Sequence, residues 1–462
     1  MKERQVRGMF DTTIAAIATP LAVGGVGMVR ISGPNAYDVA KAVFDPISKK
    51  DIAKQKGYTA LFGHVMADGK MIDEAVALFY RAPKSFTGED VVEITCHGGV
   101  YLVRELLRAC LDNGAVMAGP GEFSKRAFLN GKLDLTRAEA TVDLINARTG
   151  QSAAAALSVM DGHLYKTIVD IRNVLMDLAA QMAAYVDYPD EEIPDLEPEA
   201  LEETLKECER KLGDLIANFD RGALIREGIN TTIVGKPNVG KSTLMNLLAG
   251  KDKSIVTQIA GTTRDVVEDT VILGDAILNL ADTAGIRQTE DVVEQIGVDK
   301  AYKYLSSAQL VLAVFDGSKQ LNEDDLDLLG RLDMPAVIIV NKSDLEQKID
   351  MAPLHATGKR ILTISAKDSG ALKELELAIN ECLNLADLDL SAGVLANERQ
   401  LQSAKEAHRQ VGSAVEALQY MMTYDAVAIN IDMAIEALFD LTGERASEEI
   451  ISRIFENFCV GK

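Results

Sequence analysis

The sequence contains no tryptophan, and only 5% of its 462 residues are aromatic. Its five cysteines are scattered and form no Cys-X-X-Cys pair, which excludes a disulfide framework and a cysteine-rich zinc site. Nowhere do about 18 apolar residues follow one another, so no membrane-spanning helix is predicted. The first residues include basic side chains but no apolar signal-peptide core, and we therefore expect a cytoplasmic protein.

Positive charge is also scarce. The chain has 48 Lys and Arg residues against 70 Asp and Glu residues, which gives a formal net charge of -22. This balance argues against a broad nucleic-acid-binding face and against adsorption to anionic membranes. An RNA substrate would need either a small basic patch or a partner protein to hold it. At about 150 residues per domain, the length suggests about three domains.

Residues 1–125 have the pattern of a mixed α+β domain. Short apolar runs at 27–32 and 90–95 are bounded by glycine-rich turns and predict strands. Residues 36–43 and 101–113 have helical periodicity.

Two stretches with a helical apolar stripe flank the middle of the chain. In each stretch apolar residues recur at steps of three or four, as expected for one face of a helix. The first stripe consists of Leu164, Ile168, Ile171, Leu175 and Leu178, and the second of Leu401, Ala404, His408, Val411, Val415, Leu418 and Met422. We predict one discontinuous helical domain, formed by residues 126–225 and 387–462, with His408 as a packed core residue.

Residues 226–386 alternate apolar runs with turn and helix signals. The runs are residues 231–234, 267–273, 277–280, 310–315, 336–340 and 361–364. This alternation predicts a doubly wound, mostly parallel sheet, inserted into the helical domain.

The strongest motif is the phosphate-binding loop Gly235-Lys-Pro-Asn-Val-Gly-Lys-Ser242, which lies between a predicted strand and a predicted helix. Its glycines allow main-chain N–H groups to surround phosphates at a helix N-terminus. We expect Lys241 to contact the β- and γ-phosphates and Ser242 to ligate Mg²⁺.

Four further motifs predict that the nucleotide is GTP. Asp282-Thr-Ala-Gly285 places a carboxylate and a glycine N–H near Mg²⁺ and the γ-phosphate, and Gly261-Thr-Thr-Arg-Asp265 provides Thr263 for Mg²⁺. Asp344, in Asn341-Lys-Ser-Asp344, is able to accept from guanine N1–H and its 2-amino group, a pairing that adenine lacks. Ser365-Ala-Lys367 would contact guanine O6 through main-chain N–H groups.

This block resembles the Era-like branch of GTPases, which implies GTP hydrolysis. Ile286 follows Gly285 at the place where Ras-type proteins carry the glutamine that orients water. Glu294 is the candidate replacement, although it is equally well explained as a surface acid. Asn238 either ligates a monovalent cation that replaces an arginine finger or only shapes the loop.

Motifs outside this block extend the resemblance to the whole chain, which is similar to the MnmE (TrmE) family of tRNA modification GTPases. The motifs are Gly25-Val-Gly-Met-Val-Arg-Ile-Ser32, Ser85-Phe-Thr-Gly-Glu-Asp90, the segment from Pro120 to Asp134, and the terminal Cys459-Val-Gly-Lys462. The fold class that the resemblance implies is multidomain α/β. It comprises an N-terminal α+β tetrahydrofolate-binding-like domain that forms a homodimer, a discontinuous helical domain and an inserted Ras-like doubly wound G domain.

The resemblance also implies functional residues. Folate binding is assigned to Arg30, Glu89, Lys132 and Lys462; Mg²⁺ to Ser242 and Thr263; K⁺ to Asn238, Thr257, Ile259 and Thr262; and water activation to Glu294. The predicted GTP-binding set is Asn238, Val239, Gly240, Lys241, Ser242, Thr243, Thr257, Gln258, Ile259, Ala260, Gly261, Thr262, Thr263, Asp282, Thr283, Ala284, Gly285, Asn341, Lys342, Asp344, Ser365, Ala366 and Lys367. A role for the Cys459 thiol in carbon transfer is a further hypothesis.

The reaction implied by the resemblance joins an aminomethyl or carboxymethylaminomethyl group to C5 of the wobble uridine, position 34, of certain tRNAs. It uses a folate-borne one-carbon unit, from 5-formyl- or methylene-tetrahydrofolate. The resemblance also implies a flavoprotein partner, MnmG (GidA), in a heterotetramer-type complex, and we expect this partner to make most of the tRNA contacts. One alternative, an Era-like ribosome-assembly GTPase, needs an RNA-binding appendage that is not evident after Leu385. A membrane-remodelling GTPase needs a basic lipid-binding segment that this acidic chain does not show.

Overall fold

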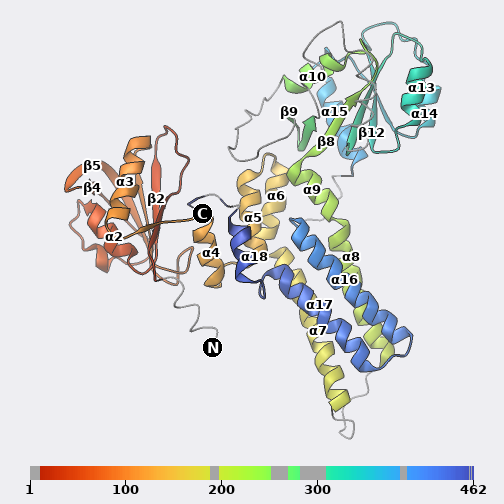
Figure 1. Ribbon diagram of the computed structural model, residues 1–462. Coiled ribbons are helices and arrows are strands. Elements are labelled where there is room, and N and C mark those ends of the chain that lie inside the picture. Colours follow the sequence, from red (N-terminus) through yellow and green to blue (C-terminus); the bar gives the residue numbers. More distant parts are fainter. Residues whose placement is uncertain are drawn as a thin grey trace. The chain divides into compact units, whose positions relative to one another are not determined.

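The computed structural model of the chain describes residues 11–187, 197–250, 269–280, 308–384, 393–456, 458 and 460–461 (Figure 1). The chain forms two compact units. The first contains Met1–Val142 and Asp432–Lys462, and the second contains Asp143–Ile431.

A seven-stranded sheet forms the centre of the first unit. Its strands are β1 (Ile14–Ile17), β2 (Gly27–Ser32), β3 (Phe44–Pro46), β4 (Thr59–Ala67), β5 (Lys70–Tyr80), β6 (Val91–Cys96) and β7 (Val116–Met117). They lie in the order β3-β4-β5-β6-β2-β1-β7, and every pair is antiparallel except β1 with β7. The strand predicted at 27–32 has the expected bounds, and the one predicted at 90–95 is shifted by one residue.

Alternation along β2 separates the core of this unit from its polar side chains. Val29 and Ile31 are fully buried in the core, while Arg30 between them belongs to the opposite face of the sheet. Helices α2 (Ala36–Val43) and α3 (Val100–Asp112) contribute their apolar faces to the same core. Arg30 is therefore positioned on the face that these helices do not cover.

The remaining helices of the first unit are α4 (Glu122–Leu129), α5 (Leu135–Asn146) and α18 (Glu448–Phe455). A second apolar cluster joins residues from both ends of the chain, with Leu135 beside Phe455 and Phe458. This packing brings the C-terminal residues next to α4, and Lys125 Nζ donates to Ser452 Oγ at 3.0 Å across 327 positions of the sequence.

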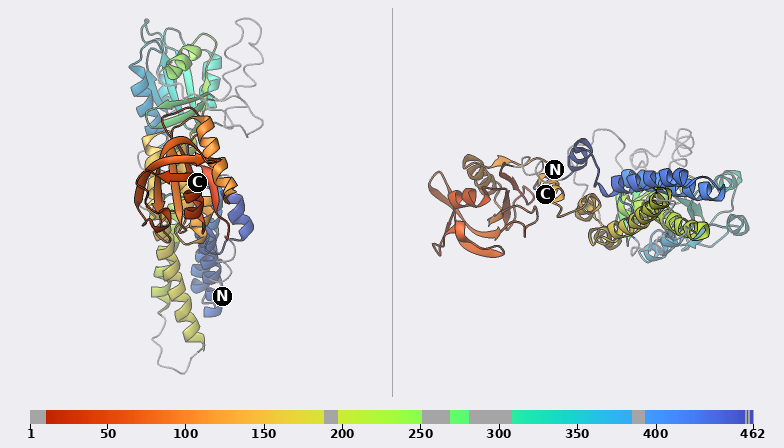
Figure 2. Two further views of the ribbon diagram at one scale, coloured as in Figure 1. Left: turned by 90° about the vertical axis from the view of Figure 1, so that its left-hand side faces the viewer. Right: turned by 90° about the horizontal axis from the view of Figure 1, so that it is seen from below.

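The helical part of the second unit confirms the first predicted stripe and corrects part of the second. It contains α6 (Gly150–Met160), α7 (His163–Asp187), α8 (Pro198–Ala217), α9 (Phe219–Glu227), α16 (Glu398–Gln419) and the beginning of α17 (Tyr424–Thr442), whose residues from Asp432 onward belong to the first unit. Figure 2 shows α16 running alongside α8. All five residues of the α7 stripe are buried.

Three residues of the second stripe, His408, Leu418 and Met422, are not fully buried, and Leu418 is half-buried. His408 is only half-buried, because it lies beside Gly213 at the edge of the contact between α8 and α16. Met422 is 54% exposed, because α16 ends at Gln419 and Met422 belongs to the turn that follows. The buried face of α16 instead includes Ala407 and Gln410.

A six-stranded sheet forms the other part of the second unit. Its strands are β8 (Ile229–Val234), β9 (Asp269–Leu273), β10 (Ala276–Leu280), β11 (Leu310–Asp316), β12 (Ala336–Asn341) and β13 (Arg360–Thr363). In the order β13-β12-β11-β8-β10-β9, every pair is parallel except β10 with β9. The helices are α10 (Lys241–Ala249), α13 (Glu323–Gly330), α14 (Ala352–Ala356) and α15 (Ala371–Cys382).

Strand β11 shows why its apolar run is continuous. Leu312 and Val314 belong to the core on one face of the sheet, and Ala313 and Phe315 belong to the core on the other. A central parallel strand covered on both faces has this composition. The predicted fold class, with a mixed N-terminal sheet, helical segments on both sides and an inserted doubly wound domain, is confirmed.

The four cysteines that the structure describes are free thiols. Cys96, Cys110 and Cys208 are buried, and burial raises the pKa of the Cys110 thiol to about 12. Cys382 is half-buried, and Cys459 lies outside the described residues. None of the helices in the described ranges is both long and apolar enough to cross a membrane.

Candidate functional site

The phosphate-binding loop connects β8 to α10 in the second unit. Gly235 and Gly240 both have positive φ angles, 144° and 104°. A Cβ atom at Gly235 would collide with the Val314 carbonyl, and one at Gly240 with the Asn341 amide. Glycine is therefore required at both positions, and α10 begins directly after the loop with its N–H groups available for an anion.

Lys241 folds its ammonium group back over this loop. Nζ donates to the carbonyl oxygens of Gly235, at 2.5 Å, and Lys236, at 2.7 Å. Burial lowers the pKa of Lys241. Ser242 and Thr243 are exposed in the first turn of α10, next to this ammonium group. The loop therefore presents one cation and two hydroxyl groups at a helix N-terminus.

Asn341 links three of the predicted motifs. Its side-chain Nδ2 donates to the Val239 carbonyl at 2.8 Å, and its Oδ1 accepts from the Ala366 N–H at 2.9 Å. The residue is 3% exposed and comes directly at the end of β12. One neutral amide thus holds the phosphate loop and the 365–367 loop at fixed positions.

Lys342 makes a second connection to the phosphate loop. Its Nζ donates to the Asn238 carbonyl at 2.9 Å and to Asp316 Oδ2 at 2.6 Å. Burial opposes the charge of Asp316, but the hydrogen bonds from Lys342 and Ser318 lower its pKa. Asn238 and Lys342 both have left-handed backbone conformations, with φ of 63° and 67°.

Asp344, the predicted guanine reader, is an ionised acceptor. Lys367 Nζ donates to Oδ2 at 3.1 Å and Ser365 Oγ donates to Oδ1 at 3.0 Å. These two hydrogen bonds lower the pKa of Asp344. Both oxygens therefore already accept from donors, as they would from the two N–H groups of guanine.

The structure brings the described members of the predicted GTP set together at the carboxyl ends of β8, β12 and β13. The catalytic candidate Glu294 lies outside the described residues, as do the other predicted members of the GTP set: Thr257, Gln258, Ile259, Ala260, Gly261, Thr262, Thr263, Asp282, Thr283, Ala284 and Gly285. Among the residues that the structure describes, no group of three His, Cys, Asp or Glu side chains could hold a metal ion.

A second candidate site lies on the sheet of the first unit, around Arg30. Its Nε donates to Glu93 Oε1 at 2.7 Å, across the β2–β6 register. The guanidinium carbon lies 5.7 Å from the Phe86 ring centroid and 5.6 Å from that of Phe123. Arg30 is thus held by one carboxylate and two aromatic rings.

The C-terminal tail reaches the same arginine. Arg30 Nη1 donates to the Gly461 carbonyl at 3.1 Å, and Val460 forms an antiparallel bridge with Pro120. Gly461 has a φ of 96°, and a Cβ atom there would collide with the Ile17 carbonyl. Cys459 and Lys462, two further predicted site residues, lie outside the described residues.

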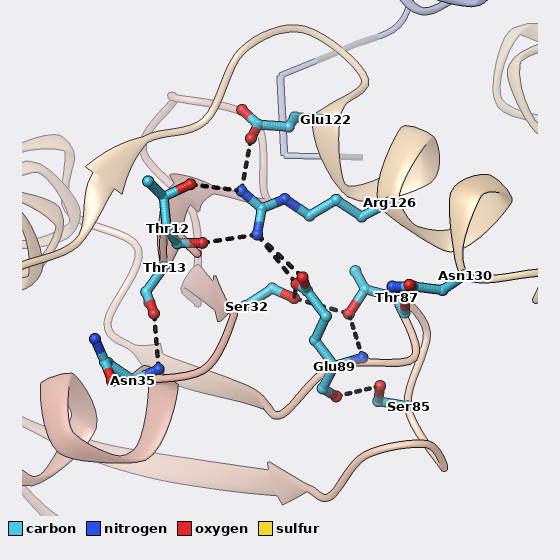
Figure 3. Close-up of polar contacts among 10 residues, drawn as sticks. All are labelled: Thr12, Thr13, Ser32, Asn35, Ser85, Thr87, Glu89, Glu122, Arg126 and Asn130. Carbon is cyan, nitrogen blue, oxygen red and sulfur yellow. Dashed lines mark hydrogen bonds and ion pairs between the residues drawn. The ribbon is translucent and has the colours of Figure 1, made fainter. Parts of the chain in front are cut away.

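Glu89 ends a tight loop that begins at Ser85 (Figure 3). Ser85 Oγ donates to the Glu89 carbonyl at 2.5 Å, and the Glu89 N–H donates to Thr87 Oγ1 at 3.2 Å. Ser32, two residues after Arg30 on β2, donates from Oγ to Glu89 Oε2 at 2.7 Å. Lys132 donates from Nζ to the Pro83 carbonyl at 3.1 Å, so it lies against the segment that leads into this loop.

Arg126 of α4 is a site residue that the sequence prediction missed. Its Nη1 lies 3.2 Å from each carboxylate oxygen of Glu89, and its Nη2 donates to Glu122 Oε1 at 2.8 Å (Figure 3). Nη1 also donates to the Thr12 carbonyl at 2.8 Å. The Glu122–Arg126 spacing of four residues on a helix was an available signal, but the contact with Glu89 spans 37 residues and has no local signature.

Comparisons with known proteins cover almost the whole chain. The family described as "GTP-binding protein TrmE N-terminus" matches residues 13–132, and the family described as "MnmE helical domain" matches residues 135–459. A protein named tRNA modification GTPase MnmE from Acetivibrio thermocellus is 41% identical over 458 residues, which is 98% of this chain and 99% of that protein.

A protein of the same name from Heliobacterium modesticaldum is 42% identical over 466 residues, which is 98% of this chain and 100% of that protein. Among solved structures, the FeoB G domain from Methanococcus jannaschii is 22% identical. That match covers 34% of this chain and 98% of the FeoB chain, with a TM-score of 0.25.

Proposed function

This chain belongs to the MnmE family of tRNA modification GTPases and is a GTP hydrolase, and from that premise we propose how its two sites cooperate. GTP hydrolysis, activated by K⁺, drives dimerisation of the G domains and a conformational change. The N-terminal domain binds a tetrahydrofolate derivative that supplies a one-carbon unit. Together with a flavoprotein partner, MnmG, the protein adds an aminomethyl-type group to C5 of the wobble uridine of certain tRNAs.

The observation that supports the proposal most strongly is that Asn341 and Lys342, from the predicted guanine-reading motif, donate hydrogen bonds to carbonyl oxygens of the phosphate loop. The site fits a guanine nucleotide with Mg²⁺: Lys241 provides a cation for the phosphates, Asp344 an ionised acceptor for the base, and Ser242 an exposed hydroxyl group for the metal. In the proposal Thr263 is the second protein ligand of Mg²⁺. The ion neutralises charge on the β- and γ-phosphates when it is bound.

We assign water positioning to Glu294 and the K⁺ site to Asn238, with Thr257, Ile259 and Thr262. Asn238 fits this role because its backbone is fixed by the hydrogen bond from Lys342, next to the phosphate loop. K⁺ would supply positive charge where other GTPases use an arginine finger.

The N-terminal site fits a reduced folate. A pterin ring carries adjacent N–H donors that suit the Glu89 carboxylate, and a folate tail carries carboxylates that suit Arg30 and Lys132. Both cations and the acid lie around one loop and one helix, 83–89 and α4. In the proposal Lys462 completes the folate contacts and the Cys459 thiol takes part in carbon transfer. A Cys459→Ser variant with full wobble-uridine modification would exclude an essential thiol.

The net charge of -22 supports a division of labour with the partner. We propose that this protein contributes GTP-driven motion, a folate and a homodimeric frame, while the flavoprotein contributes most of the positive surface that binds tRNA. A protein this acidic needs such a partner because phosphate contacts dominate tRNA affinity.

Mass analysis of wobble uridines in cells that lack this protein tests the proposed function. We expect the C5 modification to disappear and to return with the wild-type gene. A Glu294→Ala protein should bind GTP with unchanged affinity but hydrolyse it slowly, and replacement of K⁺ by Na⁺ should lower turnover sharply. Unchanged uridines would contradict the proposed reaction, and equal turnover in both salts would contradict the K⁺ site.

A further inference from the structure

The buried guanidinium group of Arg126 holds Glu89, a residue of the candidate folate site, in position. The Arg126 side chain is 0% exposed, and its donors reach Glu89, Glu122 and Thr12. Glu89 is 14% exposed by its side chain, so its carboxylate lies between Arg126 and the surface of the unit. Arg126 itself has no exposed surface, and it therefore acts on a ligand only through its neighbours.

The contacts of Glu89 leave acceptor capacity on its carboxylate. Oε2 accepts from Ser32 and from Arg126, and Oε1 accepts from Arg126. A carboxylate offers about four lone-pair directions. At least one direction on Oε1 therefore remains for a ligand, and a carboxylate held by an arginine accepts hydrogen bonds without donating any.

The charges around Arg126 explain why Glu89 and Glu122 would be affected by the loss of this arginine. Glu89 and Glu122 both point to the same guanidinium group, which is their shared counter-charge (Figure 3). Without Arg126, two carboxylates would approach one another in a largely buried setting, where like charges repel strongly. Glu89 would then leave the position that Ser32 and Arg126 now define.

We infer that Arg126, supported by Ser32, is the positioning residue that makes Glu89 select ligands with two adjacent N–H donors, as on the 2-amino-4-oxo edge of a reduced pterin. This inference rests on the proposed folate site. A 4-amino pteridine has a bare ring nitrogen at the same edge, and its lone pair would face an acceptor. The arrangement therefore predicts discrimination between the 4-oxo and the 4-amino ring.

The test measures the dissociation constants of 5-formyltetrahydrofolate and of its 4-amino analogue on the full-length chain at about pH 8. The variants are Arg126→Gln, Arg126→Lys and Ser32→Ala. Arg108→Gln is the matched control, because Arg108 is an exposed arginine on α3 of the same unit. A GTP titration of each variant reports on the other unit.

We expect Arg126→Gln to lower the affinity for the 4-oxo ligand at least about tenfold, because a hydrogen bond to a charged group contributes a factor of about ten or more to affinity. The dissociation constant of the 4-amino ligand should change by less than about twofold. The ratio of the two dissociation constants, which measures the preference for the 4-oxo ring, should therefore become smaller. Ser32→Ala should weaken the 4-oxo ligand about threefold, and Arg126→Lys should recover part of the loss since it keeps the charge. Arg108→Gln and all GTP affinities should match the wild type.

The inference is overturned if both ligands weaken by one common factor in the Arg126 variants, which would indicate a structural role only. It is also overturned if Ser32→Ala and Arg126→Lys leave the affinities and their ratio unchanged. A wild-type chain that binds neither pteridine overturns the folate site itself, and this inference with it. A wild-type chain that binds, with variants that do not differ from it, overturns the inference alone.

Discussion

The two candidate sites are both held in place by one buried polar residue that is distant in sequence from the loop it fixes, but the two residues differ in charge. Asn341 fixes the phosphate loop through neutral hydrogen bonds to main-chain groups of Val239 and Ala366. Arg126 fixes Glu89 through an ion pair and balances a second acid, Glu122. A neutral amide is sufficient where main-chain N–H groups of the loop are expected to bind the ligand. An arginine is needed where the expected ligand-binding group is a carboxylate, because its charge must be balanced.

This difference decides how each site responds to damage. Replacing Asn341 leaves the main-chain N–H groups of the phosphate loop in place as donors. The loop would then be held less firmly, but it would still offer the same donors to a ligand. A carboxylate that loses its counter-charge is left unpaired in a largely buried place, which is far more costly. The two sites can therefore be altered one at a time, with the other site as the reference.

The largest effect is expected for Lys241→Ala. This change removes the Lys241 ammonium group, which lies over the phosphate loop and donates to two of its carbonyl oxygens at 2.5 and 2.7 Å. We expect the same ammonium group to donate to the phosphates of bound GTP. Two charge-assisted hydrogen bonds to phosphate contribute on the order of 100-fold in affinity or more. GTP titration should show this loss, while affinity for 5-formyltetrahydrofolate should remain unchanged.

Lys373→Ala is the matched control for this experiment, since Lys373 is an exposed lysine on α15. It should leave both ligand affinities at wild-type values. If Lys241→Ala also weakened the folate, the two sites would be coupled, and the comparison between independent sites would fail.

A smaller effect is expected for Asn341→Ala. The variant leaves the Val239 carbonyl and the Ala366 N–H without their partner in a place where Asn341 itself is 3% exposed. Each such unsatisfied group costs about 1–3 kcal/mol. We expect GTP to bind about 10- to 100-fold more weakly, measured by titration, and the unfolding midpoint to fall.

Gln402→Ala, which removes an exposed amide on α16, is the control for Asn341→Ala. Its GTP affinity should not change. An Asn341→Ala protein with wild-type GTP affinity would show that Lys342 alone is sufficient to hold the phosphate loop.

The same contrast explains what the sequence could predict. Lys241, Asn341 and Asp344 belong to contiguous motifs at strand ends, and parallel strands bring such ends to one edge of a sheet, so their grouping followed from pattern alone. Arg126 lies in the segment from Pro120 to Asp134, whose only sequence signal is the family resemblance, and its partner Glu89 is 37 residues away on another element. No periodicity encodes an ion pair between a helix and a loop, so this residue emerged only from the structure.

The contact between Arg30 and the tail shows the same limit more strongly, because it joins residues 431 positions apart. The buried α7 stripe was predictable, since periodicity reports on one face of one helix. His408 and Met422 were predicted wrongly for the same reason: periodicity does not show where a neighbouring helix lies or where a helix ends.

A further, weaker effect is expected for Gly461→Ala. With φ at 96° and the Ile17 carbonyl in the way of a Cβ atom, the alanine variant costs about 1–3 kcal/mol of local strain. The tail should then detach more often from Arg30, and carboxypeptidase should trim the C-terminus several-fold faster. Val460→Ala is the control, because Val460 is 52% exposed. Equal trimming of Gly461→Ala and the wild type would contradict a docked tail.

The smallest effect concerns the pair of His97 with Asp73 in the first unit. His97 Nδ1 lies 2.7 Å from Asp73 Oδ1, and this hydrogen bond raises the pKa of His97. Burial opposes the charge of Asp73, but hydrogen bonds from the His97 side chain and N–H lower its pKa. The pair therefore stabilises the fold above the unfolded pKa of the acid, near 3.8, and loses its contribution as pH rises through the raised pKa of His97.

His97→Ala should lower the unfolding midpoint of the first unit slightly at pH 6 and not at pH 9, as measured by thermal unfolding. His97→Gln is the matched control, because it keeps a donor that does not titrate, and it should differ from His97→Ala by the same small amount at both pH values. The effect is small because the His97 side chain is 69% exposed, and exposed pairs contribute little. A His97→Ala deficit that is larger at pH 9 than at pH 6 would have the opposite sign and would contradict this linkage.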